Sequence, residues 1–169
     1  MPHREKRLFD CLVELGIKTE THRHPPLHTV AESQARRGSI AGGHCKSLFL
    51  KDKASHYLLV VMGETRQLDM VGLFKSGLLP VKRLSFASAE AMEKMLGVTP
   101  GAVTPFALIN ARDHQQELTV VLDQEMMTQA LLNYHPLHNG ATTTISSTDL
   151  VKFIRHCGFD PVTVDFARL

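Results

Sequence analysis

The sequence predicts a mixed α/β (α+β) fold in which helices flank a mixed sheet, within one domain over residues 1–169. Apolar β-prone runs interleave irregularly with segments of helical periodicity, a pattern typical of this class. At 169 residues, the chain is long enough to bury a core and short enough for one domain. Its 43% hydrophobic and 21% charged residues are typical of a globular protein.

Helices are predicted where apolar periodicity follows a capping residue. Ser88 and Ser146 are N-cap residues, and Thr29 with Glu32 has the capping-box spacing. Asp123 is a further candidate cap, and glycines follow three of the segments as natural stops. The predicted helices span residues 4–15, about 30–37, 88–96, 123–132 and 146–157.

Strands are predicted from short apolar runs bounded by turn residues. The runs 47–50 and 57–62 flank the polar turn DKASH and should form a hairpin. The runs 107–109 and 118–122 suggest a second pair around NARDHQQE, and 142–145 has strand character.

Charge and apolar patterning bear on location and partners. The charged N-terminus lacks the features of a secretory signal, and the longest apolar run, 58–62, cannot cross a bilayer, so a cytoplasmic location without a membrane partner is expected. Net charge is only +2, but residues 36–53 hold five basic residues against one acid. No helix-turn-helix spacing supports DNA binding.

Cysteine and histidine patterns give little support to metal or thiol chemistry. Cys11, Cys45 and Cys157 lack CxxC spacing and should be reduced thiols. Alternate histidines in HRHPPLH (residues 22–28) could face one metal, but nothing completes such a site, so no metal or other cofactor is expected. His44 beside Cys45 suggests a thiol nucleophile, yet neighbours on a strand point to opposite faces, which favours a core cysteine.

Three segments could line a polar cleft. Lys46 follows Gly42 and Gly43 at the start of a predicted strand, although position alone favours a solvated lysine. The loop 101–105 combines a glycine, which lets a ligand approach the backbone, with a rigid proline, although spacing alone favours a plain turn. His135 and Asn139 stand four residues apart before a glycine. The residues alone support only an α+β domain with a polar cleft.

Five segments together resemble the YbaK/ProRS-type aminoacyl-tRNA editing domains, in order and over nearly the whole chain. They are HTVAESQ (28–34), GGHCKSLFLKD (42–52), RLSFAS (83–88), LGVTPGAVTPFALIN (96–110) and HPLHNGATTTIS (135–146). Within that family the sequence is most similar to the freestanding, alanine-specific type. Ser47, where many relatives carry asparagine, and His138, at a variable position, are the visible departures.

The resemblance implies roles for particular residues. It implies that Lys46 is the editing lysine, and that the other members of the site are substrate-binding residues: Gly101, Ala102, Val103, Thr104, Pro105, His135 and Asn139. Nearby basic residues are candidates for tRNA phosphate contacts: Arg36, Arg37, Lys51 and Lys53. The implied partners are mischarged tRNA(Pro) and prolyl-tRNA synthetase.

The implied activity is metal-independent hydrolysis of the ester in Ala-tRNA(Pro). A pocket built for proline cannot strongly reject the smaller alanine, because lost apolar contact is worth only about 1 to 3 kcal/mol. A second site that excludes proline by size restores accuracy, with Phe49 and Met62 as candidate walls. Two alternatives stay open: a deacylase for tRNA mischarged with cysteine, serine or threonine, and a noncatalytic tRNA-binding module.

Overall fold

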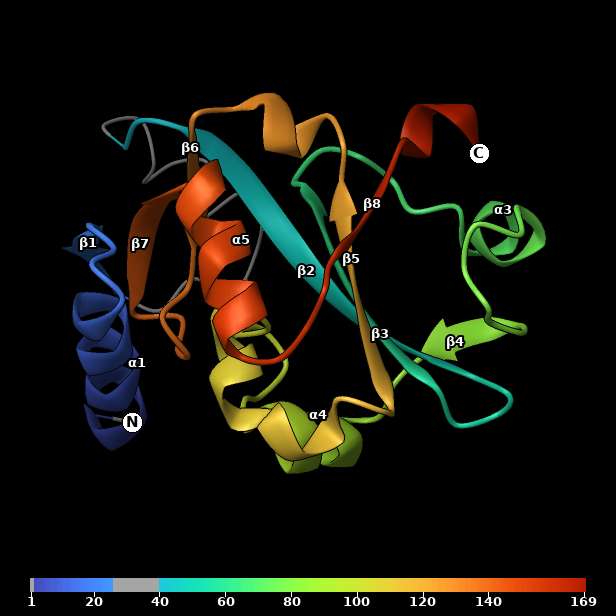
Figure 1. The fold of residues 1–169 in the computed structure, drawn as a ribbon, viewed down its shortest axis with the longest axis horizontal. Helices are drawn as coiled ribbons and strands as arrows, with labels where there is room; N and C mark the ends of the chain where they lie inside the picture. Colours follow the sequence, from blue (N-terminus) through green and yellow to red (C-terminus); the bar gives the residue numbers. More distant parts are fainter. Residues whose placement is uncertain (1, 26–39) are drawn as a thin grey trace.

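The computed structural model describes residues 2–25 and 40–169 (Figure 1). The predicted helix at about 30–37 therefore lies outside the described residues. The α-helices are α1 (Pro2–Glu14), α3 (Met70–Lys75), α4 (Ala89–Leu96) and α5 (Ser147–His156). The 3-10 helices are η2 (Pro105–Asn110), η3 (Arg112–His114), η4 (Met126–Thr128) and η5 (Phe166–Arg168).

The strands form a mixed eight-stranded sheet, as the fold class predicts. They are β1 (Glu20–Arg23), β2 (Gly43–Asp52), β3 (Tyr57–Gly63), β4 (Leu84–Phe86), β5 (Leu118–Asp123), β6 (Leu131–Tyr134), β7 (Ala141–Ser146) and β8 (Val162–Val164). Their order is β1-β7-β6-β2-β3-β5-β8, and β4 pairs with β2 outside this path. The sheet contains both parallel pairs, such as β3 with β5, and antiparallel pairs, such as β2 with β3.

Strand β2 is the long diagonal element of Figure 1, and it joins the two halves of the sheet. It pairs antiparallel with β3 from Cys45↔Gly63 to Lys51↔Tyr57, which confirms the predicted hairpin. At its start it pairs parallel with β6, and near its end antiparallel with β4.

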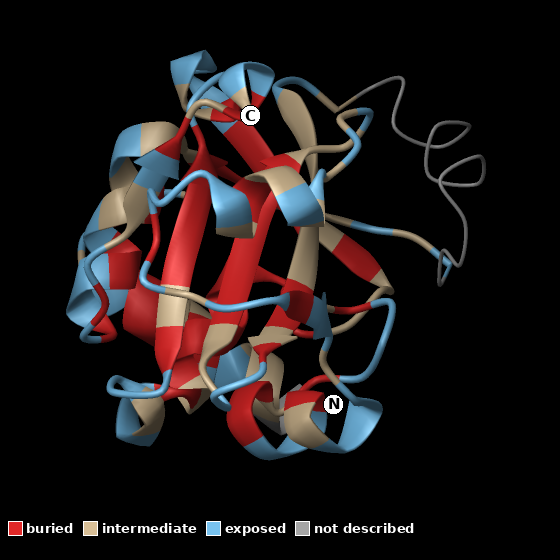
Figure 2. Cartoon of the chain, turned by 90° about the vertical axis from the view of Figure 1, so that its right-hand side faces the viewer, coloured by how far each residue is buried: buried red, intermediate tan, exposed pale blue. Residues whose placement is uncertain are grey.

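Buried side chains lie on both faces of the sheet, as the red strands between largely exposed helices show in Figure 2. One cluster packs sheet residues such as Phe49 and Val61 against α1, α4 and α5. The second packs Leu50 and Val60 of the opposite face against α3 and the C-terminal segment. Strands covered on both faces read as continuous apolar runs, which explains the sequence of β3.

The capping residues predict two helices well. Ser88 accepts a hydrogen bond from the amide of Ala91, and Gly97 ends α4 in the left-handed conformation at φ 65°. Ser146 accepts from the amide of Asp149 at the start of α5. The N-terminal helix is also confirmed, as α1.

Two predicted elements are wrong. Residues 107–109 are not a strand: they lie in η2, where Pro105 occupies the first turn and the Thr104 side chain caps the amide of Phe106. Every residue from Pro105 to Ile109 is buried, and periodicity cannot separate a fully buried helical turn from a strand. The pair with 118–122 therefore does not form, and β5 pairs with β3 and β8.

The helix predicted after Asp123 is also wrong. The Asp123 carboxylate does accept the Glu125 amide, but it also accepts the Gly63 amide from the neighbouring strand. Only the short η4 follows, and the chain then enters β6. Pairing of β6 with both β2 and β7 overrides the helical propensity of this segment. No helix in the described ranges is long and apolar enough to span a membrane.

Asp52 stabilises the β2–β3 turn from a buried position. Its carboxylate accepts hydrogen bonds from the amides of Ala54 and His56, both at 2.8 Å, and of Lys82 at 3.0 Å. Burial alone would raise the pKa of Asp52, but these amides hold it below the usual value of 3.8. The charged carboxylate therefore stabilises the fold above its ordinary pKa.

We expect Asp52→Asn to lower the free energy of unfolding by about 1 to 3 kcal/mol, because one buried amide loses its acceptor. Wild-type stability should fall as the pH drops through the lowered folded-state pKa, and the variant should lose less there. Urea unfolding between about pH 3 and 6 measures both curves. Parallel curves would show that the Asp52 charge is not stabilising.

Candidate functional site

Lys46 lies near the start of β2, half-buried, and pairs with the fully buried Met62 of β3. Residues that pair across antiparallel strands share a face, so Lys46 and Met62 point to the same side of the sheet. Within the described residues, no hydrogen bond or ion pair engages the Lys46 ammonium. Burial lowers its pKa from 10.5, because a less hydrated site disfavours the charged form.

The parallel register of β2 with β6 brings His135 toward Lys46. Gly43 pairs with Leu132 and His44 with Asn133; Lys46 follows two residues after His44 on β2, and His135 follows directly after β6 ends at Tyr134. Cys45 and Tyr134 follow directly after the His44–Asn133 pair, and the Tyr134 hydroxyl interacts with the Cys45 thiol. Because side chains alternate along a strand, Lys46 lies on the same face of β2 as His44, and His44 pairs with Asn133, two residues before His135.

Polar residues continue this side of the sheet across β6, β7 and the end of β1. Asn133 pairs with Thr144, whose hydroxyl donates to the Asn133 side-chain oxygen. The ring of His24 lies 2.9 Å from the Thr142 hydroxyl and edge-on to His135, with ring centroids 6.4 Å apart. We call this set the polar sheet face; its members are His24, Lys46, Asn133, His135, Thr142 and Thr144.

The segment 135–140 joins β6 to β7 and carries His135 and Asn139. The ring of His135 hydrogen-bonds the carbonyl of Ala141 through Nδ1 at 2.9 Å. Burial, the largest influence, lowers the pKa of His135, so the neutral ring predominates at pH 7. Leu137 has φ 72°, a left-handed conformation that non-glycine residues rarely adopt. His135 therefore has one fixed ring nitrogen and one available for a ligand.

The loop 101–105 places backbone donors between α4 and η2. Gly101 is exposed at φ 93°, which favours glycine, and Thr104 is fully buried with its hydroxyl turned back to cap η2. Ala102 donates to Thr99, whereas the amides of Gly101, Val103 and Thr104 donate no hydrogen bond within the described residues. Such unused amides are ready donors for a carbonyl oxygen or an oxyanion.

The sheet does not by itself join this loop to Lys46. Ala102 and Val103 pack with the cluster that contains Phe49, on the other side of β2 from Lys46. No hydrogen bond or ion pair in the described part of the chain connects them. Phe49 stacks on Tyr57 and faces away from Lys46, whereas Met62 shares its face; of the two candidate pocket walls, only Met62 is near the lysine.

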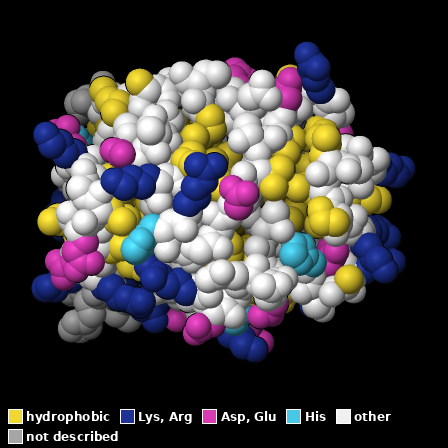
Figure 3. Space-filling view, viewed as in Figure 1, with side chains coloured by type: hydrophobic (Ala, Val, Ile, Leu, Met, Phe, Trp, Pro, Cys, Tyr) yellow, Lys and Arg dark blue, Asp and Glu magenta, His cyan; other side chains and the backbone are white. Residues whose placement is uncertain are grey.

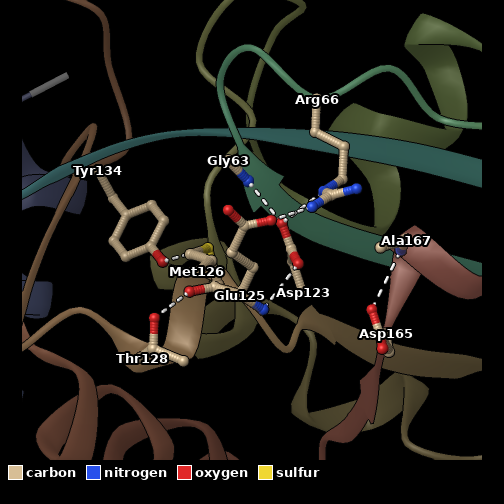
Figure 4. A network of polar contacts seen from close by, with 9 residues as sticks. All are labelled: Gly63, Arg66, Asp123, Glu125, Met126, Thr128, Tyr134, Asp165 and Ala167. Carbon is tan, nitrogen blue, oxygen red and sulfur yellow. Dashed lines mark hydrogen bonds and ion pairs between the residues drawn. The ribbon is translucent and has the colours of Figure 1, made fainter.

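A cleft of about 530 Å³ adjoins the start of β2, at the carboxyl ends of β3 and β5. Figure 4 shows Arg66 at its rim, between the carboxylates of Asp123 and Glu125. Asp123 is only 2% exposed, and it also accepts the amides of Gly63 and Glu125. The sequence analysis missed this cleft because its residues come from four separate segments.

On the face seen in Figure 3, several Lys and Arg side chains lie next to one another at the lower left, and elsewhere they are scattered among Asp and Glu. Lys51 lies five residues beyond Lys46, about 17 Å along the strand and on the other face. Lys53 is exposed in the β2–β3 turn. Arg36 and Arg37 lie outside the described residues, so a tRNA contact by these four residues stays a prediction.

No group of three or more His, Cys, Asp or Glu side chains is placed to hold a metal ion in the described ranges. His28 of the histidine-rich segment lies outside them. Cys45 is not fully in the core, as a core cysteine would be: it is partly buried, packs against the core cluster and also lines the cleft. Burial raises its pKa to about 11, so it is protonated at pH 7 and is a poor nucleophile.

Comparisons with known proteins identify the family of this chain. Residues 24–153 match the aminoacyl-tRNA editing domain. This match covers most of the sequence, and the chain belongs to the aminoacyl-tRNA editing domain family.

Relatives at about one-third identity connect the chain to prolyl-tRNA editing. It is 34% identical over 160 residues to prolyl-tRNA synthetase associated domain-containing protein 1 of Bos taurus, covering 93% of this chain and 92% of the relative. It is 32% identical over 148 residues to the prolyl-tRNA editing protein ProX of Acetoanaerobium sticklandii, covering 87% and 88%.

A solved structure assigned provisionally to a trans-editing enzyme for prolyl tRNA synthetase has a TM-score of 0.71 at 18% identity. The similarity covers 96% of this chain and 95% of that structure, and it shows that the two share a fold.

We expect Cys45→Ala to leave whatever hydrolytic activity the wild-type chain shows unchanged, because the protonated thiol takes no part in it. The variant should be less stable by about 1 kcal/mol, since a packed side chain is lost. Turnover and thermal unfolding of the purified variant measure the two effects. Loss of turnover in a stably folded variant would instead make Cys45 part of the chemistry.

Proposed function

We propose that this protein is a trans-editing hydrolase that cleaves the ester bond of mischarged Ala-tRNA(Pro). The observation that carries the proposal is the half-buried Lys46, directed by the β2–β6 register to the same side as His135, with no partner for its ammonium among the described residues. The family supplies the substrate class, an aminoacyl-tRNA, and the prolyl-tRNA editing relatives favour tRNA(Pro).

The proposed reaction needs little machinery, because the aminoacyl ester is already activated. Water adds to the ester carbonyl carbon and forms a tetrahedral oxyanion, which collapses to release the amino acid and the free ribose hydroxyl. In this proposal Lys46 places a positive charge near the tRNA terminus, and the loop 101–105, whose Ala102 and Val103 pack on the other side of β2, contacts the ester region from that side through its unused amides. The ribose hydroxyl beside the ester orients the attacking water.

His135 and Asn139 position the substrate in this proposal. His135 has one ring nitrogen fixed by the Ala141 carbonyl, so the other can hold a substrate polar group at a set angle. Met62 pairs with Lys46 and is fully buried, so in this proposal it supports from below the surface that limits the size of the aminoacyl group. Proline is excluded by volume and alanine is accepted.

We expect the wild-type protein to release alanine from Ala-tRNA(Pro) and to leave Pro-tRNA(Pro) intact. Lys46→Ala should lower kcat by about 100-fold, because one charged group near the developing oxyanion is lost. The measurement is the time course of deacylation with labelled amino acid. Lys75→Ala, at an exposed lysine of α3, is the matched control and should have wild-type activity.

Cys-, Ser- and Thr-tRNA substrates distinguish the proposed activity from its main alternative, which is a deacylase for another mischarged tRNA. Faster release of one of these amino acids than of alanine would keep the enzyme class and change its substrate. Tight binding of tRNA without cleavage of any ester would instead support the noncatalytic tRNA-binding module.

We expect Lys51 of β2 and Lys53 of the β2–β3 turn to contribute a salt-dependent part of tRNA binding. Lys51→Ala and Lys53→Ala should each raise KM without lowering kcat, because phosphate contacts position tRNA and take no part in the reaction. The logarithm of affinity should fall less steeply with the logarithm of salt concentration, by about one unit of slope for each contact removed. Unchanged slopes would show that tRNA binds elsewhere.

A further inference from the structure

The first turns of α1 contact both loops that carry the proposed substrate-binding residues. Glu5 is only 14% exposed, and its Oε1 accepts hydrogen bonds from Arg23 at 2.8 Å and from His138 at 2.9 Å. Burial alone would raise the pKa of Glu5, but Arg23 and His138 lower it. Glu5 is therefore a charged group held between β1 and the segment 135–140.

His138 is held at both nitrogens of its ring. Its Nδ1 accepts a hydrogen bond from the Gly140 amide at 3.0 Å, so its Nε2 carries a proton and donates to Glu5. One imidazole thus joins helix α1 to the backbone of the segment that carries His135 and Asn139. His138 stands at a position that varies in the resembled family. In this structure it contacts the Glu5 carboxylate and the Gly140 amide.

The segment 135–140 has a backbone conformation that needs such support. Leu137 has φ 72°, and its amide donates to the His135 carbonyl at 3.0 Å in a tight turn. A non-glycine residue keeps this conformation only where its surroundings fix it. The His138 contacts lie directly after the turn, and the His135 contact to Ala141 lies across its ends.

The same helix also contacts the start of the other loop. The Arg4 guanidinium donates to the Gly97 carbonyl and pairs with Glu93 at 3.1 Å. Gly97 ends α4 and is followed by the segment that leads to Gly101. Asn110, the last residue of η2, donates to the Leu96 carbonyl at 3.0 Å and accepts from Arg7 of α1 at 3.5 Å, so both ends of this loop region are held near α1.

We propose that Glu5 and His138 are positioning residues: through them, helix α1 sets the placement of His135 and Asn139 against the aminoacyl ester. This inference rests on the proposed function. Neither residue needs to touch the substrate, because the effect passes through the backbone of 135–140. Catalysis is sensitive to placement, and a shift of about 1 Å in a substrate-positioning element can reduce the rate up to about 100-fold.

The test compares Glu5→Ala, His138→Ala and the double variant in single-turnover and steady-state deacylation of Ala-tRNA(Pro). Each single variant should lower kcat by about 10-fold or more with little change in KM, because the ester still binds but is misplaced. The double variant should lose no more than one single variant, because the two residues act through one contact.

Two further variants separate positioning from general stability. Glu5→Gln keeps a side-chain oxygen that can accept from His138, so it should recover most of the rate. Lys6→Ala removes the exposed Lys6–Asp10 pair from the same helix and should leave kcat unchanged. The proposal would be overturned if the losses in kcat of the Glu5 and His138 variants were additive. It would also be overturned if these losses equalled that of Lys6→Ala, or if they followed the unfolded fraction of each variant.

A structural readout keeps this inference separate from the proposed activity. The Gly140 amide donates to His138, so its hydrogen exchange should accelerate in Glu5→Ala and stay slow in Lys6→Ala, whether or not the wild type cleaves any ester. Inactivity of the wild type toward every aminoacyl-tRNA would refute the proposed function alone. Unchanged Gly140 exchange in Glu5→Ala would refute the positioning role.

Discussion

The placement of the candidate site depends on the register of β2. Side chains alternate along a strand, so Cys45 and Phe49 enter the core cluster beneath α5 while Lys46 faces the other side with Met62. A slip by one residue would turn Lys46 into that core and Cys45 out of it. β2 pairs with β3, β4 and β6 at once, so such a slip would break three sets of hydrogen bonds.

Two local features fix the start of β2 in this register. A Cβ atom at Gly42, which has φ 101°, would lie 2.8 Å from the Leu131 carbonyl oxygen, so only glycine permits this approach of β6. The side-chain Nδ2 of Asn133 then donates to the carbonyls of Ala41 and Gly43. The glycine pair before Lys46 therefore has a steric role in strand pairing, which is independent of any ligand.

Local chemistry explains which parts of the fold the sequence predicts. Ser88, Gly97 and Ser146 act within one turn of backbone, and their effects on helix ends can be read without knowing the rest of the chain. The segments 107–109 and 131–134 are harder to read. Burial on all sides hides the helical periodicity of the first, which forms a 3-10 helix begun by Thr104 and Pro105, and pairing with β2 makes the second a strand.

The candidate site, like the fold, has one part that the sequence predicts and another that depends on segments far apart in the chain. Lys46 and the loop 101–105 stand out in the sequence because of their glycines and the family resemblance, whereas the polar sheet face exists only once β6 lies beside β2. That pairing places Asn133 beside His44, 89 residues earlier in the chain, and His135 follows two residues after Asn133. The contacts of Glu5 with Arg23 and His138 likewise join three elements, and no spacing rule predicts them.

Burial acts on the neighbouring residues Cys45 and Lys46 through one physical effect, with opposite chemical results. In both, a poorly hydrated surrounding favours the neutral form, so the thiol pKa rises to about 11 and the lysine pKa falls. For the thiol this removes the reactive thiolate. For the lysine, partial burial reduces screening by water, so an ammonium held there interacts more strongly with a developing negative charge. The strand therefore inactivates the residue that chemistry alone would favour as a nucleophile, and it strengthens electrostatic stabilisation by the residue beside it.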